Sequence, residues 1–307
     1  MDEAPTQKRL WPVPEVRALR MRDFHMLRKL VYDEAGIHLP DAKRVLVEAR
    51  LARRLRELGL RSYEQYCELV LDSANSEERV RMLDCITTNE THFFREPKHF
   101  QFLTERVFPE WAAQARARTR GKRLRVWSAA CSTGEEPYSL AMCLLTAFPR
   151  EAGWEIELYA SDISTRALDH AVDATWPIDK AQEIPERERK RYMLRGIGAR
   201  EGELRCGPEL RELVRFVRIN LNQPPIPLPG QFDLIFCRNV LIYFDAGSRA
   251  RVITGLLERL HARGHLFVGH SETLHNVTRK LTLIAPSVYV PSSAGTQPEA
   301  LSDEEAR

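Results

Sequence analysis

Residues 125–138 read RVWSAACSTGEEPY, and this stretch decides the fold. An apolar strand candidate, 124–129, leads into a tight turn that contains Gly134, and a helix candidate follows over 137–147. A strand that passes through a turn into a helix is the repeating unit of a parallel α/β sheet. Ligands bind such sheets at the carboxyl ends of the strands, so we expect a binding site at this turn.

The same rhythm continues toward the C-terminus. Short apolar runs occupy 156–160, 214–219, 232–237 and 265–268, and an amphipathic helix is predicted over 165–172. Alternating strands and helices predict a parallel sheet that is covered on both faces. A last pair of runs, 281–284 and 288–290, predicts an antiparallel hairpin at the edge of the sheet.

Composition and pattern divide the chain further. The segment 176–213 is charged and rich in glycine, so we interpret it as a subdomain inserted in a crossover between two strands. The predicted parts are a loose leader at 1–14, an all-helical domain at 15–85, a linker with a helix at 86–120, the α/β domain at 121–290, and a tail at 291–307 with the composition of disorder.

Breaking and capping residues mark the helices of the N-terminal part. Helix-spaced apolar residues run up to Gly36, which is expected to end the first helix. Asp41 is the predicted N-cap of a second helix over 42–58. Two further helices are predicted to start near Ser62 and Ser76.

The helix that is predicted over 42–58 is strongly basic. Its cations are Lys43, Arg44, Arg50, Arg53, Arg54 and Arg56. The apolar stripe that is predicted to be buried on its other side is Val45, Leu46, Ala49, Ala52 and Leu55. A charge run is commonly a solvated face, but charges of mostly one sign also suit an acidic partner.

Composition excludes several classes of protein. Hydrophobic residues make up 43% of the chain and charged residues 29%, which is typical of a globular protein. No apolar run approaches the roughly 20 residues that span a bilayer, and the N-terminus lacks the apolar core of a signal peptide. A net charge of only +3 argues against a nucleic-acid-binding protein.

The cysteines and histidines predict neither disulfides nor a metal site. None of the six cysteines belongs to a C-x-x-C pair, so we expect reduced thiols in a cytoplasmic protein. Gly264 and Gly269 interrupt any helix near the C-terminal histidines, and no further ligand of familiar spacing completes a set there. These histidines are His261, His265, His270 and His275.

The charges at the glycine turn indicate the kind of ligand. Gly134 is the only glycine of the turn, so the G-x-G-x-x-G pattern of dinucleotide sites is absent. Glu135 and Glu136 stand at the helix start, where they would repel a phosphate. A cationic ligand without phosphate, such as S-adenosylmethionine, fits these charges. The alternative is that both acids only complement the helix dipole.

Polar residues also follow two other strands. Asp162 ends the second strand, where nucleotide-binding sheets hold ribose hydroxyls, although it could instead be the N-cap of the next helix. Arg238 and Asn239 follow the apolar run FDLIFC. Tyr243 and Phe244 come next and have packing in the core as their alternative role.

Blocks of sequence along nearly the whole chain resemble one family. They are TNETHFFR at 88–95, WSAACSTGEEPYS at 127–139, ASDI at 160–163, NL at 220–221, FCRNVLIYFD at 236–245 and GHSE at 269–272. Together they are similar to the CheR family, the glutamate O-methyltransferases of chemotaxis receptors. The resemblance implies a class I S-adenosylmethionine-dependent methyltransferase with a Rossmann-like, mostly parallel seven-stranded sheet. It also implies a small β-subdomain at the insertion and an N-terminal all-helical domain.

The resemblance also implies site residues. Cofactor contacts fall on Asn89, Thr91, Arg95, Glu136, Asp162, Asn220, Leu221, Arg238 and Asn239. Arg95 and Tyr243 match positions beside the transferred methyl group, and S-adenosylhomocysteine would be the product. Glu90 and His92 depart from the pattern of the first block, so the resemblance does not extend to the detailed polarity of the pocket.

The implied partner is the cytoplasmic domain of a methyl-accepting chemotaxis receptor, and the basic helix would bind its glutamate-rich bundle. In some members of the family a loop of the β-subdomain, R-G-x-G, grips a peptide at the receptor tail, and Arg195, Gly196 and Gly198 fit that loop. We expect a cytoplasmic monomer that is recruited to receptor arrays, is not inserted in the membrane, and binds neither metal nor nucleic acid. The alternatives are a methyltransferase for RNA or small molecules and an inactive receptor-binding adaptor.

Overall fold

The computed structural model describes residues 16–275 and 277–292. The expected leader at 1–14 lies outside these residues, and so does nearly all of the expected tail at 291–307. The described chain divides into two compact units. One contains residues 16–34 and 38–87, and the other contains residues 35–37 and 88–292.

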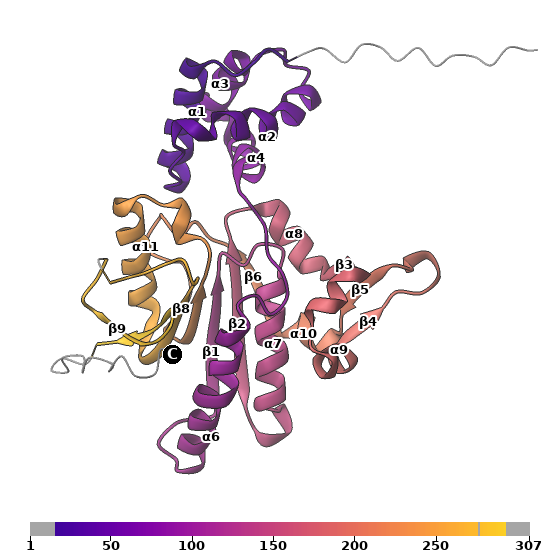
Figure 1. Ribbon diagram of the computed structural model, residues 1–307, viewed down its shortest axis with the longest axis vertical. Coiled ribbons are helices and arrows are strands. Elements are labelled where there is room, and N and C mark those ends of the chain that lie inside the picture. Colours follow the sequence, from indigo (N-terminus) through magenta and orange to yellow (C-terminus); the bar gives the residue numbers. More distant parts are fainter. Residues whose placement is uncertain (1–15, 276, 293–307) are drawn as a thin grey trace, which may run out of the picture. The chain divides into compact units, whose positions relative to one another are not determined.

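The first unit is made of helices (Figure 1). They are α1 (Met21–Ala35), the 3-10 helix η1 (Asp41–Lys43), α2 (Arg44–Glu57), α3 (Tyr63–Leu71), the 3-10 helix η2 (Ser73–Asn75) and α4 (Ser76–Ile86). The first helix ends where it was predicted to end, because Gly36 follows with a φ of +70°. Ser62 caps α3 by accepting a hydrogen bond from the amide of Gln65 at 3.3 Å.

The predicted N-cap of the second helix is wrong. Asp41 lies inside η1, and α2 begins only at Arg44. The carboxylate of Asp41 accepts a hydrogen bond from Arg28 at 2.7 Å instead of capping a helix. A partner that is distant in the sequence therefore binds the side chain that the local pattern predicted as the cap.

The predicted buried stripe of α2 is also wrong. The helix buries Val47, Leu51 and Leu55, so only Leu55 belongs to both sets. The other predicted positions are exposed or half-buried, with Val45 65% and Leu46 37% exposed. These positions are Val45, Leu46, Ala49 and Ala52. A short helix rich in Leu, Val and Ala carries more than one apolar stripe, and packing against α4 selects one of them.

The second unit is built on a seven-stranded sheet, as predicted. Its strands are β1 (Arg123–Ala129), β2 (Glu155–Asp162), β6 (Val214–Arg218), β7 (Phe232–Cys237), β8 (Leu260–Val268), β9 (Leu281–Ala285) and β10 (Val288–Pro291). Their order in the sheet is β6-β2-β1-β7-β8-β10-β9. β10 is antiparallel to β8 and β9, and the other pairs are parallel. The mostly parallel sheet and its edge hairpin are therefore confirmed.

Helices cover both faces of this sheet (Figure 1). Leu124 and Val126 of β1 share a core cluster with α6 (Phe108–Arg116) and α7 (Glu135–Ala147). Trp127 and Ala129 of the same strand share another with α11 (Ala246–Arg259). Successive side chains of a strand point to opposite faces, so the neighbouring Val126 and Trp127 are both apolar because β1 is buried on both faces. Further helices are α5 (Pro97–Phe102), the π-helix η3 (Leu103–Val107), the 3-10 helix η4 (Arg150–Ala152) and α8 (Thr165–Asp173).

The predicted insertion forms a separate small sheet. Its strands β3 (Thr175–Pro177), β5 (Glu203–Cys206) and β4 (Met193–Arg195) pair antiparallel in that order. The segment also contains the 3-10 helices η5 (Ile178–Glu183) and η6 (Gly198–Arg200), with α9 (Glu186–Tyr192) and α10 (Pro208–Leu213). None of the helices in the described part of the chain has the length and hydropathy that crossing a membrane requires.

Candidate active site

The candidate site lies where the strand order of the large sheet reverses. β1 is central, with β2 and β6 on one side and β7 and β8 on the other. Open α/β sheets bind ligands in the crevice outside the carboxyl ends of the strands at such a point. Ala129 of β1 is in register with Ser161 and with Cys237, so Asp162 and Arg238, one residue further along β2 and β7, flank the end of β1.

Several residues at this edge have unusual backbone conformations. Ala130, Ser132 and Asn239 have φ values of 62°, 50° and 58°. Phe94 and Glu96, next to the end of the first block, have φ values of 51° and 56°. A positive φ is unfavourable for residues other than glycine, and such strain clusters at functional sites. The strain supports the assignment of this edge as the site.

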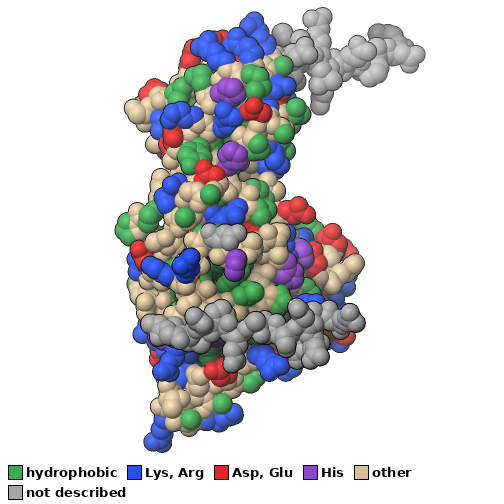
Figure 2. Space-filling view, turned by 60° about the vertical axis from the view of Figure 1, so that its left-hand side comes forward, with side chains coloured by type: hydrophobic (Ala, Val, Ile, Leu, Met, Phe, Trp, Pro, Cys, Tyr) green, Lys and Arg blue, Asp and Glu red, His purple; other side chains and the backbone are tan. Residues whose placement is uncertain are grey.

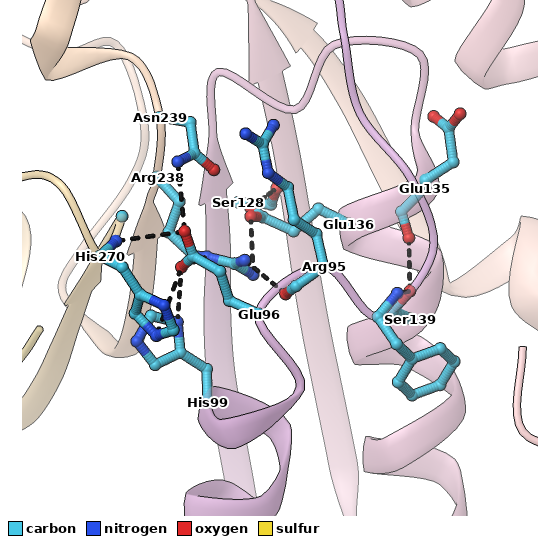
Figure 3. A network of polar contacts seen from close by, with 12 residues as sticks. Arg95, Glu96, His99, Ser128, Glu135, Glu136, Ser139, Arg238, Asn239 and His270 are labelled. Carbon is cyan, nitrogen blue, oxygen red and sulfur yellow. Dashed lines mark hydrogen bonds and ion pairs between the residues drawn. The ribbon is translucent and has the colours of Figure 1, made fainter. Parts of the chain in front are cut away.

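Glu136, in the first turn of α7, turns toward Ser128 and Arg238 (Figure 3). The hydroxyl of Ser128 donates a hydrogen bond to its Oε1 at 2.7 Å, and Nη1 of Arg238 lies 3.4 Å from its Oε2. Burial raises the pKa of Glu136, although Arg238 acts in the opposite direction. A buried carboxylate whose pKa is raised is stabilised by a further cation, so this position suits a positively charged ligand group.

Its neighbour Glu135 points away from this cluster (Figure 3). Its Oε2 accepts a hydrogen bond from Thr133 at 2.6 Å, and its Oε1 lies 3.7 Å from the ammonium group of Lys180 in the insertion. The two acids, which are equivalent in the sequence pattern, therefore face different partners. Only Glu136 lies with the charged residues at this edge of the sheet.

Asp162 joins the ends of two strands. Its Oδ2 accepts a hydrogen bond from the amide of Ser132 at 2.8 Å, and its Oδ1 accepts one from the amide of Ser164 at 2.9 Å. The N-cap of α8 is Ser164, whose hydroxyl accepts from the amide of Ala167, so the alternative role of Asp162 as the cap is wrong. A carboxylate accepts up to about four hydrogen bonds, which is compatible with ribose hydroxyls as further donors.

The first block is attached to the glycine turn. The carbonyl oxygen of Asn89 accepts a hydrogen bond from the hydroxyl of Ser132 at 3.0 Å. Its side-chain amide donates to the hydroxyl of Ser164 at 3.5 Å. These contacts bring Asn89 to the loops that Asp162 also holds, although the two residues are far apart in the sequence.

Arg238 is the centre of a polar network (Figure 3). Its side chain is 1% exposed, its Nε lies 3.2 Å from Oε2 of Glu96, and its Nη2 donates to the carbonyl oxygen of Arg95. Glu96 also accepts from the side chain of Asn239 at 3.2 Å and from the amide of His270 at 3.1 Å. Burial disfavours the carboxylate of Glu96, but Arg238 and these N–H groups outweigh burial and lower its pKa. Sequence reasoning missed Glu96, although it directly follows Arg95.

Glu96, His99 and His270 bring potential metal ligands within 4.8 Å of one another. His99 is buried, and burial together with Arg238 lowers its pKa to about 4, so its ring is neutral at pH 7. The guanidinium of Arg238, however, already places a cation 3.2 Å from the carboxylate of Glu96. We interpret the three residues as part of the polar network, and the absence of a bound metal stays a prediction.

Glu272 is a second acid that sequence reasoning did not assign to the site. Its Oε2 accepts hydrogen bonds from the amides of Asn239 at 2.9 Å and Gly269 at 2.7 Å, and its Oε1 accepts from the amide of Ile242 at 3.2 Å. Burial raises its pKa against the effect of these donors. The carboxylate joins the loops after β7 and β8, and the GHSE block was its only signal in the sequence.

The other candidates lie around the same edge. Asn220 and Leu221 follow β6, where the side chain of Asn220 accepts from the amide of Asn222 at 3.0 Å and Leu221 is buried. Tyr243 is half-buried in the 3-10 helix η7 (Leu241–Tyr243), whereas Phe244 is buried and packs in the core. The alternative of core packing therefore applies to Phe244.

The two remaining candidates belong to the first block. Nη1 of Arg95 donates to the carbonyl oxygen of Glu90 at 3.0 Å. The carbonyl oxygen of Thr91 accepts from Lys180 at 3.1 Å. The sequence candidates for the cofactor site thus occupy the carboxyl ends of the strands and the segment attached to them.

Comparison with known families agrees with this arrangement. Residues 22–87 match the CheR methyltransferase all-alpha domain, and residues 89–290 match the CheR methyltransferase SAM binding domain. The chain belongs to the CheR methyltransferase family. It is therefore an S-adenosylmethionine-dependent methyltransferase, and the seven-stranded sheet is the class I fold of such enzymes.

Relatives of this CheR family member match along almost their whole length. The chemotaxis protein methyltransferase of Salmonella typhimurium is 40% identical over 88% of this chain and 91% of its own. The chemotaxis protein methyltransferase of Escherichia coli is 39% identical over 91% of this chain and 94% of its own. The solved magnesium protoporphyrin IX methyltransferase of Synechocystis, with bound S-adenosylmethionine, covers 66% of this chain and 74% of its own at 20% identity, with a TM-score of 0.29.

Proposed function

We propose that this enzyme transfers a methyl group from S-adenosylmethionine to glutamate side chains of chemotaxis receptors and so forms methyl esters. The observation that carries the proposal is the match, at about 40% identity over nearly the whole length, to enzymes that are named chemotaxis protein methyltransferases. The proposal places the enzyme in the cytoplasm at receptor arrays, where sensory adaptation takes place.

The residues at the carboxyl ends of the strands have the chemistry that the cofactor requires. Glu136 offers a carboxylate to the amino group, and Asp162 offers one to the ribose hydroxyls. The first block at 89–95 and the pair Asn220 and Leu221 supply the remaining contacts that the family pattern implies. Ser128 and Arg238 hold Glu136 from two sides, so its carboxylate is oriented before a ligand binds.

The reaction needs no general base. A glutamate side chain with an ordinary pKa of about 4.3 is already ionised at neutral pH and can attack directly. S-adenosylmethionine supplies a methyl group on a sulfonium; as the new oxygen–carbon bond forms, the sulfur–carbon bond breaks and S-adenosylhomocysteine leaves. Both charges disappear together, so the work of the enzyme is to align the groups, which contributes up to roughly 7–11 kcal/mol in ideal cases.

Arg95 and Tyr243 are proposed to act beside the transferred methyl group. Arg95 would orient the acceptor carboxylate or help to hold the cofactor, and Tyr243 would donate a hydrogen bond to the acceptor oxygen. Arg95→Ala and Tyr243→Phe should both slow a single turnover with receptor fragment and saturating cofactor. Wild-type rates in both variants would contradict these roles.

The receptor-binding face of α2 is narrower than the sequence suggested. Arg44 donates to the carbonyl oxygen of Leu19, and Arg50 to that of Ile86. Arg54 pairs with the buried Glu78 through two hydrogen bonds of 2.9 Å and 2.6 Å. These three arginines are half-buried and hydrogen-bonded within their own unit. We therefore assign the receptor contacts to the exposed Lys43 of η1 and to the exposed Arg53 and Arg56 of α2, although Arg53 also pairs with the exposed Glu57.

Apolar residues accompany these cations. Val45, Leu46 and Ala49 lie exposed on the same helix, and Figure 2 shows Lys and Arg side chains interspersed with hydrophobic ones on the helical unit. A surface of this kind fits the side of a receptor helix that carries glutamates beside apolar residues, and the opposite charges would raise the rate of encounter.

The loop of the β-subdomain is a second proposed contact. A side chain at Gly196 would place its Cβ 1.8 Å from the carbonyl oxygen of Arg200, and Gly198 has a φ of +58°. Both positions therefore require glycine for the shape of the loop. Leu194 and Ile197 are 52% and 84% exposed beside Arg195, so the hairpin offers apolar and cationic groups to a peptide.

The proposal is tested by methylation of receptor cytoplasmic fragments with labelled cofactor. Label that mild base releases from the receptor identifies the ester, and RNA serves as the competing acceptor. Reversing Arg53 and Arg56 to Glu should raise the Michaelis constant for receptor roughly tenfold or more and leave cofactor affinity unchanged. Reversing Arg116 and Arg263, which are exposed in the other unit, is the matched control. Label on RNA, or an equal effect of both reversals, would contradict the proposal.

A further inference from the structure

The first cofactor block is an irregular segment whose backbone is held by side chains. Residues 88–92 and 95 have neither helical nor strand structure, 93 and 94 form a turn, and 96 lies in a bend. The carbonyl oxygen of Asn89 accepts from Ser132, and the amide of Phe94 donates to the hydroxyl of Ser139 at 3.0 Å. Backbone groups outside regular structure need such partners to hold one conformation.

The middle of the block is held from the β-subdomain. The ammonium group of Lys180 donates to the carbonyl oxygen of Thr91 at 3.1 Å. Oε2 of Glu183 accepts from the amide of Phe93 at 2.9 Å. Lys180 and Glu183 lie one helical turn apart on η5 and are themselves 3.2 Å apart. We call these two residues the η5 clamp.

Packing fixes the same part of the block. Phe93 is 1% exposed and meets Trp176 of β3 edge to face, with ring centroids 4.9 Å apart. Both side chains of the η5 clamp are about one quarter exposed, at 27% and 28%, so water only partly screens their charge. Lys180 also lies 3.7 Å from Glu135 of α7, which joins the clamp to the helix that carries Glu136.

We propose that Lys180 and Glu183 are positioning residues for S-adenosylmethionine, which hold the Thr91–Phe93 backbone in its binding shape. The β-subdomain would then have two functions. Its hairpin would contact the receptor, and η5 would hold a backbone segment of the cofactor site in place. The inference rests on the proposed cofactor contacts of the first block.

The physical basis is preorganisation. Without the η5 clamp the block has to become ordered when the cofactor binds, and that loss of freedom weakens binding without removing a direct contact. Loss of one charge-assisted hydrogen bond to the block is expected to raise the dissociation constant about 5- to 30-fold.

The test uses the full chain and isothermal titration with S-adenosylhomocysteine. Lys180→Met and Glu183→Ala should each raise the dissociation constant by this factor, and Lys180→Arg should restore most of the affinity. The matched controls are Lys190→Met and Glu186→Ala, which break an exposed ion pair of 2.6 Å in the same subdomain. In both controls the affinity should stay within about twofold of wild type.

Two further measurements separate positioning from a loss of folding. Hydrogen exchange at the amide of Phe93 should become faster in Glu183→Ala, while the melting temperature stays within a few degrees of wild type. With receptor fragment as acceptor, the Michaelis constant for cofactor should rise and kcat at saturating cofactor should be retained. Unchanged affinity in both η5 variants, or a parallel loss of affinity and melting temperature in variants and controls alike, would overturn the proposal.

These outcomes are independent of the acceptor. Titration with S-adenosylhomocysteine requires no receptor, so failure of the η5 clamp leaves the proposed glutamate esterification untouched. A failure to methylate receptor glutamates would likewise leave the binding result to decide the role of the η5 clamp.

Discussion

Replacing Glu136 by Gln keeps the size of the side chain and removes its charge. The carboxylate lies 2.7 Å from the hydroxyl of Ser128 and 3.4 Å from Nη1 of Arg238, and its side chain is only 13% exposed. In the proposed complex this carboxylate accepts a hydrogen bond from the charged amino group of S-adenosylmethionine. A hydrogen bond to a charged group contributes about 1.5–3 kcal/mol. The dissociation constant for S-adenosylmethionine should therefore rise about 10- to 150-fold.

The matched control is Glu135→Gln. Both acids occupy the first turn of α7, so both contribute similarly to the helix dipole, but Glu135 faces Thr133 and Lys180. If the acids served only the dipole, the two variants would lose equal affinity. We expect Glu135→Gln to raise the dissociation constant less than about fivefold, through its contact with the η5 clamp.

The assay is calorimetric titration of both variants at pH 7 with S-adenosylmethionine and with a neutral analogue that lacks the amino group. Glu136→Gln should bind the two ligands with similar affinity, because the group that is proposed to recognise the ammonium is gone. Equal losses in the two variants, or a wild-type preference for the amino group that persists in Glu136→Gln, would refute the reasoning.

Three further outcomes follow from contacts elsewhere. Arg54→Ala leaves the buried carboxylate of Glu78, which also accepts a hydrogen bond from Tyr66, without its guanidinium partner. This variant should lower the free energy of unfolding in urea titrations by about 3 kcal/mol. Arg53→Ala, whose partner Glu57 is exposed, should lower it by less than about 0.5 kcal/mol. Burial lowers the pKa of His265 to about 4, below its ordinary 6.5, so stability is present above pH 6.5 and is lost as the pH falls toward 4. Wild type should lose about 2 kcal/mol between pH 7 and pH 5 through this residue, and His265→Gln should remove that part of the slope. Glu272→Ala leaves the amides of Asn239, Gly269 and Ile242 without their acceptor and should lower the free energy of unfolding by roughly 2–4 kcal/mol, with weaker cofactor binding in the same titrations.

Local signals in the sequence were sufficient for the architecture. The central strands contain short apolar runs, such as 234–237 in β7 and 266–268 in β8, and glycine or a capping serine marks the helix ends, as at Gly36 and Ser62. Polar residues placed directly after such strands come to one edge of a parallel sheet, because the carboxyl ends of those strands all lie there. For that reason Asp162, at the end of β2, and Arg238, directly after β7, could be predicted to lie at one edge before any contact was known.

Predictions about single polar side chains were wrong where a distant residue competes with a local partner. Asp41 has the chemistry of an N-cap, but Arg28 takes its carboxylate. The basic residues of α2 are alike in sequence, yet Arg54 forms an ion pair with the buried Glu78, whereas the side chain of Arg53 is exposed. Propensity and periodicity describe one segment at a time, so they cannot rank a local partner against a distant one.

The sequence by itself determined the fold class and the family, because these rest on patterns within short segments, and it predicted a site at the carboxyl ends of the strands. The tertiary structure alone decided which charges meet. Arg238 is 142 residues from Glu96 and lies 3.2 Å from it, and Glu183 is 90 residues from the amide of Phe93 that it holds at 2.9 Å. Contacts of this kind exist only after the sheet and the insertion have folded, and they orient the acid and the backbone that would bind the cofactor.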